Sequence, residues 1–228
     1  MDKLEDGLKK LRLYSDRTFS LLTRYIEEIE LFNPAYGLVK VKDREELIVR
    51  HILDSIAPVE IIKGLIAGEN SGQIADIGSG AGLPGIPLAI CMPKLNFTLV
   101  ERMGRRAGFL RNTLALLGLA NVFIEEAEME IIASREKKNF DVIVFRAFKP
   151  LDTVLVKNLF KFTGVNNTGI IAAYKGRKES INEEMDRLFK TPGKSGQLPA
   201  FNWEIMPLEV PFLDEERHIL LIKPGQDK

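Results

Sequence analysis

The alternation of short apolar runs with helical stretches after Gly72 constrains the fold more than any other feature of the sequence. These runs are rich in β-branched residues and cover Gln73 to Ile77, Asn96 to Glu101, Asn121 to Glu125, Phe140 to Phe145 and Gly169 to Tyr174. Strands separated by helices need crossover connections, which join parallel neighbours in one sheet. The sequence therefore predicts an α/β fold around a parallel sheet.

Two further strand-like runs close the chain, from Trp203 to Val210 and from His218 to Lys223. Only Pro211 to Arg217 separate them, whereas a parallel return needs about a dozen residues or more. We therefore expect these two strands to be antiparallel to each other. The complete prediction is a seven-stranded, mostly parallel sheet with an antiparallel last strand and helices on both faces.

The segment before the predicted sheet has a helical pattern. From Leu4 to Ile66, apolar residues recur at steps of three and four, which indicates two or three amphipathic helices. One is predicted over Thr18 to Phe32, and we expect Pro34 to stop it. A second is predicted to end at Ala57 and to begin at Asp43, whose side chain can cap the first turn.

A glycine-rich stretch, Gly68 to Gly72, is predicted to link these helices to the sheet. We therefore divide the chain into an N-terminal helical extension, residues 1–70, and an α/β domain, residues 71–228. Within the second part, an amphipathic helix is predicted from Gly104 to Leu117, and Gly118 can end it.

Composition excludes several classes of protein. The 32 Lys and Arg balance the 32 Asp and Glu, so a polyanion must be bound by a local basic patch. One Cys and two His are too few for a zinc finger or a disulfide framework, so we expect no metal. No apolar run reaches membrane-spanning length, so we expect a cytoplasmic protein, and we expect it to be a monomer.

The first predicted strand ends in a glycine-rich loop, Asp76-Ile77-Gly78-Ser79-Gly80-Ala81-Gly82-Leu83-Pro84-Gly85. Glycines allow positive φ and remove Cβ atoms that would block a ligand, and nucleotides bind at this end of the first strand in open α/β sheets. The spacing Gly80-x-Gly82-x-x-Gly85 with Glu101 matches a dinucleotide fingerprint, which predicts an NAD(P)-dependent oxidoreductase or a flavin enzyme. The spacing Asp76-x-Gly78-x-Gly80-x-Gly82 with Glu101 is instead typical of S-adenosylmethionine methyltransferases.

The acidic residues favour the methyltransferase interpretation. S-adenosylmethionine carries a sulfonium cation and an amino acid but no pyrophosphate, so Asp76 and Glu101 suit it better than they suit a dinucleotide. The antiparallel ending of the sheet favours it too, since nicotinamide-binding folds usually continue in parallel. A tight turn without a ligand is disfavoured, because four glycines in eight positions exceed what a turn requires.

With these motifs in place, the chain resembles the RsmG (GidB) family, bacterial methyltransferases that modify a guanine N7 in small-subunit (16S) ribosomal RNA. The resemblance spans most of the chain and rests on Asn33-Pro34-Ala35-Tyr36, Arg50-His51-Ile52-Leu53-Asp54-Ser55, the loop from Asp76 to Ala89, Gly104-Arg105-Arg106, Phe145-Arg146-Ala147-Phe148, Tyr174-Lys175-Gly176 and Glu216-Arg217-His218. It implies a Rossmann-like class I methyltransferase fold, S-adenosylmethionine as the donor, and ribosomal RNA or the small ribosomal subunit as the partner. A methyltransferase of the same fold with another substrate stays an alternative, and so does a non-catalytic RNA-binding protein.

The resemblance also implies which residues contact the donor. Position by position, these are Gly78, Leu83, Met129, Glu130 and Arg146, with Glu101 holding the ribose. The loop pattern adds Asp76, Gly80 and Gly82 as candidate donor-binding residues.

The chemistry of guanine N7 limits what else the enzyme needs. N7 carries a free lone pair and no proton at neutral pH, so we expect no essential general acid or base. Asn33, His51 and Arg146 are the candidates for positioning the base by stacking or hydrogen bonding. For Asn33 the competing interpretation is a turn cap, and for His51 it is an ordinary place on an amphipathic helix.

Two basic clusters are candidates for RNA binding. Arg102, Arg105 and Arg106 follow the second strand without an intervening acid, and Lys175 and Arg177 follow the fifth. Both clusters begin at strand ends near the glycine loop, where an RNA backbone would have to pass. A solvated helix face is the alternative interpretation.

Overall fold

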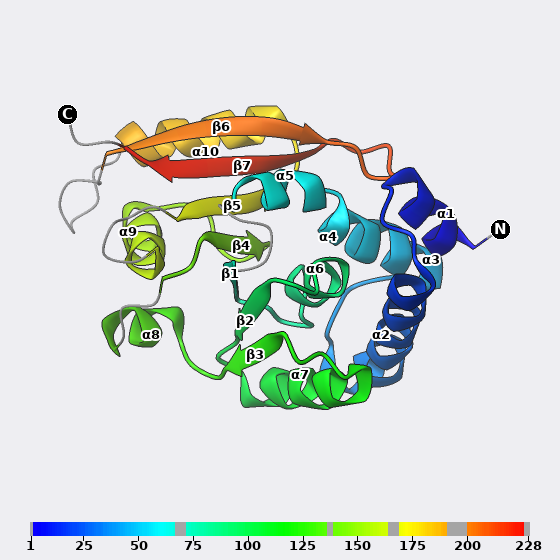
Figure 1. Ribbon diagram of the computed structural model, residues 1–228. Coiled ribbons are helices and arrows are strands. Elements are labelled where there is room, and N and C mark those ends of the chain that lie inside the picture. The colour runs from blue at the N-terminus through cyan, green and yellow to red at the C-terminus, as the bar shows by residue number, and fades with distance from the viewer. Residues whose placement is uncertain (1, 67–71, 136–138, 164–168, 191–199, 226–228) are drawn as a thin grey trace.

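A computed structural model describes residues 2–66, 72–135, 139–163, 169–190 and 200–225 of the chain (Figure 1). The predicted linker and the boundary at residues 70 and 71 fall largely outside these ranges.

The sheet has the predicted seven strands. They are β1 (Gln73–Ile77), β2 (Asn96–Val100), β3 (Val122–Glu125), β4 (Val142–Arg146), β5 (Ile170–Lys175), β6 (Phe201–Leu208) and β7 (Arg217–Pro224). Their order across the sheet is β3-β2-β1-β4-β5-β7-β6. The first five strands are parallel to one another, and β7 is antiparallel to both β5 and β6. The predicted fold class and the antiparallel closing strands are therefore confirmed.

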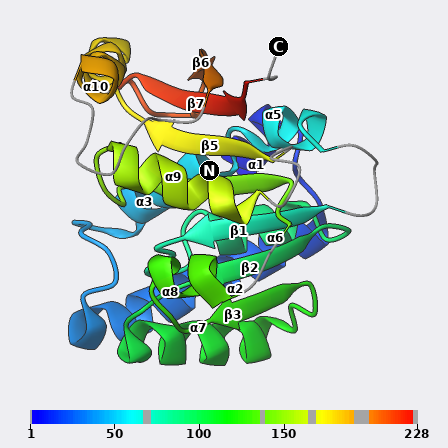
Figure 2. The same cartoon turned by 90° about the vertical axis from the view of Figure 1, so that its left-hand side faces the viewer.

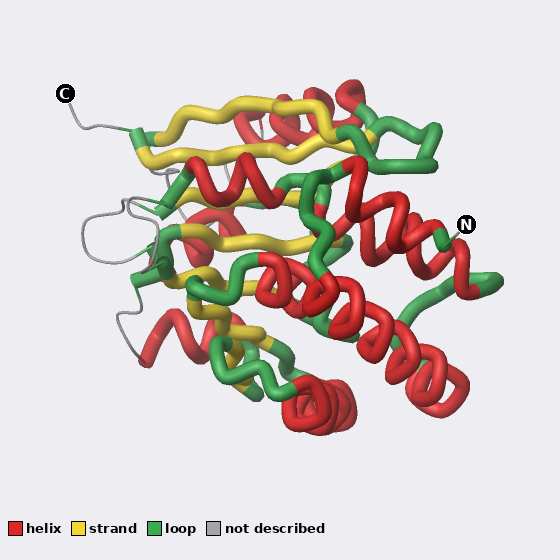
Figure 3. The backbone as a smooth tube through the Cα atoms, turned by 45° about the vertical axis from the view of Figure 1, so that its right-hand side comes forward, coloured by secondary structure: helices red, strands yellow, loops and turns green. Residues whose placement is uncertain are grey.

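Helices cover both faces of the sheet. Those before β1 are α1 (Lys3–Lys10), α2 (Asp16–Tyr36), α3 (Arg44–Leu47), the π-helix η1 (Ile48–Leu53), α4 (Asp54–Ile56) and α5 (Val59–Gly64). Those after it are α6 (Gly85–Cys91), α7 (Gly104–Leu117), α8 (Met129–Arg135), α9 (Thr153–Phe162) and α10 (Lys178–Lys190). In Figure 2, α8 and α9 lie in front of the sheet and α2 and α6 lie behind it. Figure 3 shows the strands as a twisted stack between these helices.

Successive strand residues point to opposite faces of the sheet, and each face has its own apolar core. Ile74 and Val144 face a core that also contains Leu4 and Leu22 of the N-terminal helices, together with side chains from α6 and α7. Ala75 and Ile143 face the other core, which α8, α9 and α10 complete. The predicted N-terminal extension therefore contributes directly to one of the two cores.

The predicted end of α2 is wrong. The helix begins after Ser15, whose Oγ accepts the Thr18 N–H at 3.0 Å, and it continues through Pro34 to Tyr36. Proline removes one intrahelical hydrogen bond, and in the last turn that loss is tolerated because few bonds follow it. The helix ends at Gly37, which adopts a left-handed conformation with φ 59°.

The second predicted helix is correct at its start but not in its interior. Asp43 caps α3 as expected, with Oδ1 accepting the Glu46 N–H at 2.8 Å. The following six residues, Ile48–Leu53, form a π-helix rather than an α-helix. Single π-helical turns are rare and occur mostly at functional sites. The prediction for α7 is confirmed at both ends, with Gly118 left-handed at φ 62°.

Leu22 and Leu31 test whether α2 stabilises the domain through its buried face. Leu22 is fully buried, whereas Leu31 on the same helix is 69% exposed. We expect Leu22→Ala to lower the free energy of unfolding by about 2–5 kcal/mol, because it leaves a cavity in the shared core. Leu31→Ala should change it by less than about 0.5 kcal/mol. Urea titrations measure both, and equal effects would contradict the shared core.

Candidate functional site

Two adjoining cavities lie at the carboxyl edge of the sheet. The larger has a volume of about 880 Å³ and is lined mainly by residues of η1, the glycine loop, β4 and β5. The smaller has a volume of about 420 Å³ and lies between the glycine loop and the segments that follow β2 and β3. Gly78, Ala147, Phe148 and Lys149 line both cavities. A ligand in one cavity can therefore reach a ligand in the other.

The glycine loop has the backbone conformation that its sequence predicts. Gly78, Gly80 and Gly82 have φ values of 71°, 58° and 92°, which L side chains rarely adopt. A Cβ on Gly80 would meet no atom closer than 3.9 Å, so space is open beside it. A Cβ on Gly82 would lie 2.5 Å from the Ile86 side chain, so this glycine serves packing within the protein.

Glu101 braces the loop from the end of β2. Its Oε2 accepts the Gly80 N–H at 2.9 Å, and its Oε1 accepts the Met103 N–H at 2.8 Å. The side chain also lines the smaller cavity, where the remaining lone pairs can accept hydroxyl groups. The smaller cavity combines this carboxylate with apolar side chains such as Val100 and Met129, which fits a hydroxylated sugar attached to a flat ring.

Asp76 supports the loop from behind. It is fully buried, lines neither cavity, and its Oδ2 accepts the Gly85 N–H at 3.0 Å. Burial raises the pKa of this carboxyl to about 7, although the hydrogen bond from the Gly85 N–H acts to lower the pKa. The placement of Asp76 therefore favours positioning of the loop over direct contact with a ligand.

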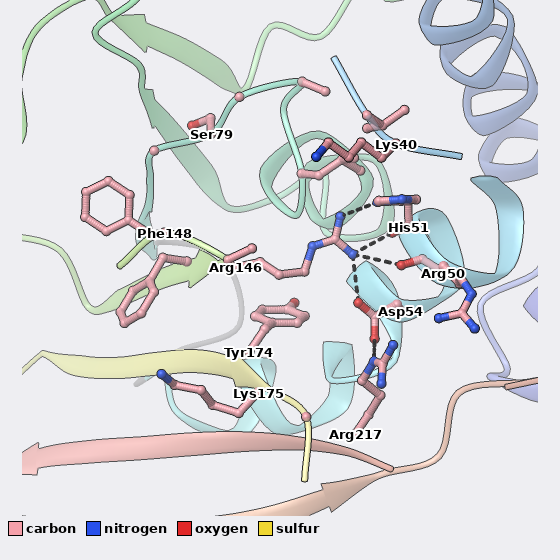
Figure 4. A pocket seen from close by; sticks show the side chains of 18 of the residues that line it. Lys40, Arg50, His51, Asp54, Ser79, Arg146, Phe148, Tyr174, Lys175 and Arg217 are labelled. Atoms are coloured by element: carbon pink, nitrogen blue, oxygen red, sulfur yellow. Dashed lines mark hydrogen bonds and ion pairs between the residues drawn. The ribbon is translucent and has the colours of Figure 1, made fainter. Parts of the chain in front are cut away.

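Arg146 and Asp54 form the centre of the larger cavity's wall (Figure 4). Arg146 Nη1 donates to Asp54 Oδ2 at 2.7 Å and to the Arg50 carbonyl at 3.1 Å. Asp54 Oδ1 accepts from Arg217 Nε at 3.1 Å, and the Asp54 side chain is only 5% exposed. One buried carboxylate thus holds guanidinium groups from β4 and β7 against the helices that precede the sheet.

His51 is held in its neutral form. Its Nδ1 lies 2.9 Å from Arg146 Nη2, and because a guanidinium can only donate, Nδ1 must accept and Nε2 carries the proton. The ring also forms a hydrogen bond with the Lys40 backbone. Burial and the Arg146 charge lower the His51 pKa to about 4. His51 is therefore not available as a general base.

Two buried tyrosines connect the N-terminal helices to this edge of the sheet, and the sequence analysis predicted neither contact. The Tyr25 hydroxyl on α2 donates to the Ala81 carbonyl in the glycine loop at 2.8 Å. The Tyr174 hydroxyl at the end of β5 donates to the Ser55 carbonyl at 2.6 Å. Nothing local in the sequence distinguishes these residues from ordinary core tyrosines.

Most of the predicted site residues meet at the two cavities. Those that line them are Gly78, Gly80, Leu83, Glu101, Met129, Glu130, His51 and Arg146. Asn33 lines neither of them, and its Oδ1 accepts the Val39 N–H at 2.9 Å just after α2. This placement favours the turn-capping interpretation of Asn33 over base positioning.

The predicted RNA-binding residues differ in whether they line a cavity, contact other side chains or are exposed. Arg102 and Arg106 line the smaller cavity, although Arg102 also pairs with Glu128 at 3.3 Å. The Arg105 guanidinium lies 5.3 Å from the centroid of the Tyr36 ring. Arg177 is exposed beyond β5.

Lys175, by contrast, is tied to the protein. Its Nζ is 2.6 Å from Glu184 Oε2, and both side chains are largely buried. This placement favours a structural role for Lys175. Sequence reasoning missed Lys40 and Lys149, two exposed lysines that line the larger cavity.

Each carboxylate that lines the larger cavity has a basic partner. Glu46 pairs with Arg50 at 3.2 Å, Asp54 pairs with Arg146 and Arg217, and Glu184 pairs with Lys175. His51 is likewise engaged through Nδ1, and His218, the other histidine at this cavity, is buried and bonded to the Gly176 carbonyl through its own Nδ1. The described residues contain no group of three His, Cys, Asp or Glu side chains that could hold a metal ion. No described helix is long and apolar enough to cross a membrane.

Sequence comparisons match nearly the whole chain to one family. Residues 18–202 match the GidB family, described as rRNA small subunit methyltransferase G. A protein of Treponema denticola named ribosomal RNA small subunit methyltransferase G is 36% identical, over 95% of this chain and 92% of its own length. One of the same name from Acinetobacter baylyi is 34% identical, over 98% of this chain and 96% of its own length.

Solved structures of methyltransferases share the fold. A candidate O-methyltransferase of Klebsiella pneumoniae aligns with a TM-score of 0.61 and 15% identity, over 97% of this chain and 96% of its own. A SAM dependent methyltransferase of Aquifex aeolicus aligns with a TM-score of 0.55 and 13% identity, over 87% of this chain and 98% of its own. At these identities the likeness concerns the fold alone.

Asp54→Asn tests the buried ion pairs. The amide removes the charge that compensates Arg146 and Arg217, so we expect the free energy of unfolding to fall by about 2–4 kcal/mol. Asp186→Asn is the control, because Asp186 pairs with Lys190 on an exposed face of α10. It should cost less than about 0.5 kcal/mol. Similar losses in the two variants would show that the buried Asp54 pairs stabilise the fold no more than the exposed Asp186 pair does.

The pKa of His51 predicts a pH dependence. The folded pKa is about 4 and the ordinary value is 6.5, so between these values the unfolded chain binds a proton that the folded chain does not. The free energy of unfolding should therefore fall as the pH drops from about 6.5 to about 4. The titration is measured from the histidine NMR signals, and the His51→Gln variant shows which of the two histidine signals belongs to His51. A His51 midpoint near 6.5 would contradict the buried, neutral ring.

Proposed function

The chain belongs to the rRNA small subunit methyltransferase G family, and from that premise we propose that it methylates N7 of a guanine in small-subunit ribosomal RNA. The observation that supports the choice of N7 is that, among the described residues lining the larger cavity, every carboxylate is held in an ion pair and His51 accepts a hydrogen bond from Arg146. A hydroxyl or exocyclic amine must lose a proton during methylation, whereas N7 attacks through a lone pair that is already free.

The residues at the smaller cavity fit S-adenosylmethionine, which supplies a methyl group on a positively charged sulfur. Glu101 would accept the ribose hydroxyls, while Val100 and Met129 would contact the adenine ring. The open space beside Gly80 lets a ligand approach the loop backbone closely. Gly78, Leu83, Glu130 and Arg146 complete the proposed donor contacts, and Asp76 and Gly82 hold the loop in shape.

The larger cavity would hold the target guanine beside the end of the donor, which would reach into this cavity along Gly80 and Leu83. Arg146 stays the candidate for positioning the base, because its guanidinium lines the cavity and is fixed by Asp54 and His51. The exposed Lys40 and Lys149 at the same cavity suit an RNA backbone, and Arg102, Arg105, Arg106 and Arg177 extend this basic surface. We propose that the protein acts in the cytoplasm, on its ribosomal substrate, and that it acts as a monomer.

Gly80→Ala tests the proposed donor site, and Gly118→Ala is a matched control. Both glycines are left-handed, with φ 58° and 62°, and neither has an atom within 3.8 Å of the added Cβ. The same backbone strain of about 1–2 kcal/mol should therefore affect both variants. Only Gly80→Ala should weaken S-adenosylhomocysteine binding, by about tenfold or more, because its methyl group enters the cavity. Calorimetry measures the affinities, and equal binding by both variants would refute the site.

The proposed function is tested on small ribosomal subunits from cells that lack the protein. Subunits incubated with the purified protein and S-adenosylmethionine should acquire N7-methylguanosine in their RNA, measured by mass spectrometry of the nuclease digest. Subunits from cells that contain the protein are the control and should accept little further methyl. Methylation of a different base, or no methylation, would contradict the proposal.

A further inference from the structure

Phe148 has an unusual position at the end of β4. It is partly buried and is one of the four residues that line both cavities. The residue before it, Ala147, has φ 49°, a left-handed conformation that costs free energy for any residue except glycine. This turn of the backbone directs the chain after Arg146 across the boundary between the cavities. Backbone strain of this kind concentrates at functional sites.

Neighbouring residues hold the Phe148 ring at this boundary. A Cβ on Gly78 would lie 2.4 Å from Cδ2 of the ring, so this glycine makes room for the phenyl group. The buried Phe145 contacts it edge to face, with 6.3 Å between ring centroids. The Lys149 ammonium lies 5.2 Å from the ring centroid, which shows that a cation can reach the ring's face.

The other aromatic side chains that line the larger cavity offer no comparable surface. Phe145 is 1% exposed and Tyr174 is 6% exposed, and the Tyr174 hydroxyl is bonded to Ser55. His218 is buried, with Nδ1 bonded to the Gly176 carbonyl, and His51 is held by Arg146. Among the described phenyl and phenol rings that line the larger cavity, Phe148 is therefore the one that is only partly buried, and it lies where base and donor must meet.

We propose that Phe148 is the platform on which the target guanine stacks during methyl transfer. Bases stack on aromatic side chains in many RNA-binding sites, and every base has a face suited to this contact. In the proposed reaction the N7 lone pair forms the new N–C bond, and the electron pair of the broken C–S bond stays on sulfur. The positive charge thus moves to the purine, and the negative face of a phenyl ring stabilises a cation stacked on it. The inference rests on the proposed function and adds Phe148 to Arg146 as a positioning residue for the base.

Phe148→Leu tests the platform, because leucine keeps the apolar volume but lacks the aromatic face. We expect kcat/KM for small ribosomal subunits to fall by about 10- to 100-fold. The affinity for S-adenosylhomocysteine should stay within about twofold, since the ring is assigned to the base and not to the donor. Phe148→Tyr should restore most of the activity. Phe123→Leu is the control, because Phe123 is an exposed aromatic residue on the edge strand β3, and it should leave the activity unchanged.

Different outcomes separate the inference from the function on which it rests. If the unaltered protein does not methylate small subunits at N7, the proposed function fails. If the unaltered protein is active and Phe148→Leu is equally active, Phe148 is not the stacking platform. If Phe148→Leu loses donor affinity in proportion to activity, the ring belongs to the donor site, and the proposal that the guanine stacks on it is again contradicted.

A fluorescence measurement gives an independent readout that does not depend on turnover. The chain has a single Trp, so the Phe148→Trp, Trp203→Phe double variant carries one indole, placed at the proposed platform. Adding a ribosomal RNA fragment that contains the target guanine should quench its emission, because the base stacks on it. Trp203→Phe, Phe123→Trp is the control and should not be quenched. If the fragment binds but the emission of the indole at position 148 is not quenched, the proposal is overturned.

Discussion

The carboxylate of Asp54 joins three parts of the chain that lie far apart in the sequence. It binds Arg146 at the end of β4 and Arg217 at the start of β7, while it sits itself directly after the π-helix. Burying a charge is costly unless it is paired, so each partner constrains the others. Arg146 then fixes the tautomer of His51, with the proton on Nε2. The shape of the larger cavity's wall thus depends on this one buried carboxylate.

The glycine loop is supported from several sides at once. Asp76 holds the Gly85 end, Glu101 holds Gly80 from β2, and Tyr25 holds Ala81 from the N-terminal helices. These groups fix the loop before any ligand arrives, so binding does not have to order it. A loop that is ordered in advance helps to hold the donor in line with the attacking atom, which an in-line displacement requires.

Local patterns predicted most of the fold and part of the site. The seven strands, α7 with its Gly118 end, and the positive φ angles of the loop glycines follow from short-range periodicity and composition. The π-helix and the Lys175–Glu184 pair could not be predicted in this way. They depend on contacts between distant segments, which a single sequence does not reveal. The same reason hid the role of Tyr25, whose hydroxyl meets a loop 56 residues away.

The shared core beneath α2 has a consequence for how the protein can evolve. Leu4 and Leu22 pack in one continuous apolar cluster with side chains of α6, α7 and the sheet. The helices before β1 are therefore not an exchangeable module that could be shuffled onto another catalytic domain. Recombination between relatives near residue 70 would mismatch the packed surfaces on either side, so natural variants should inherit the two halves together.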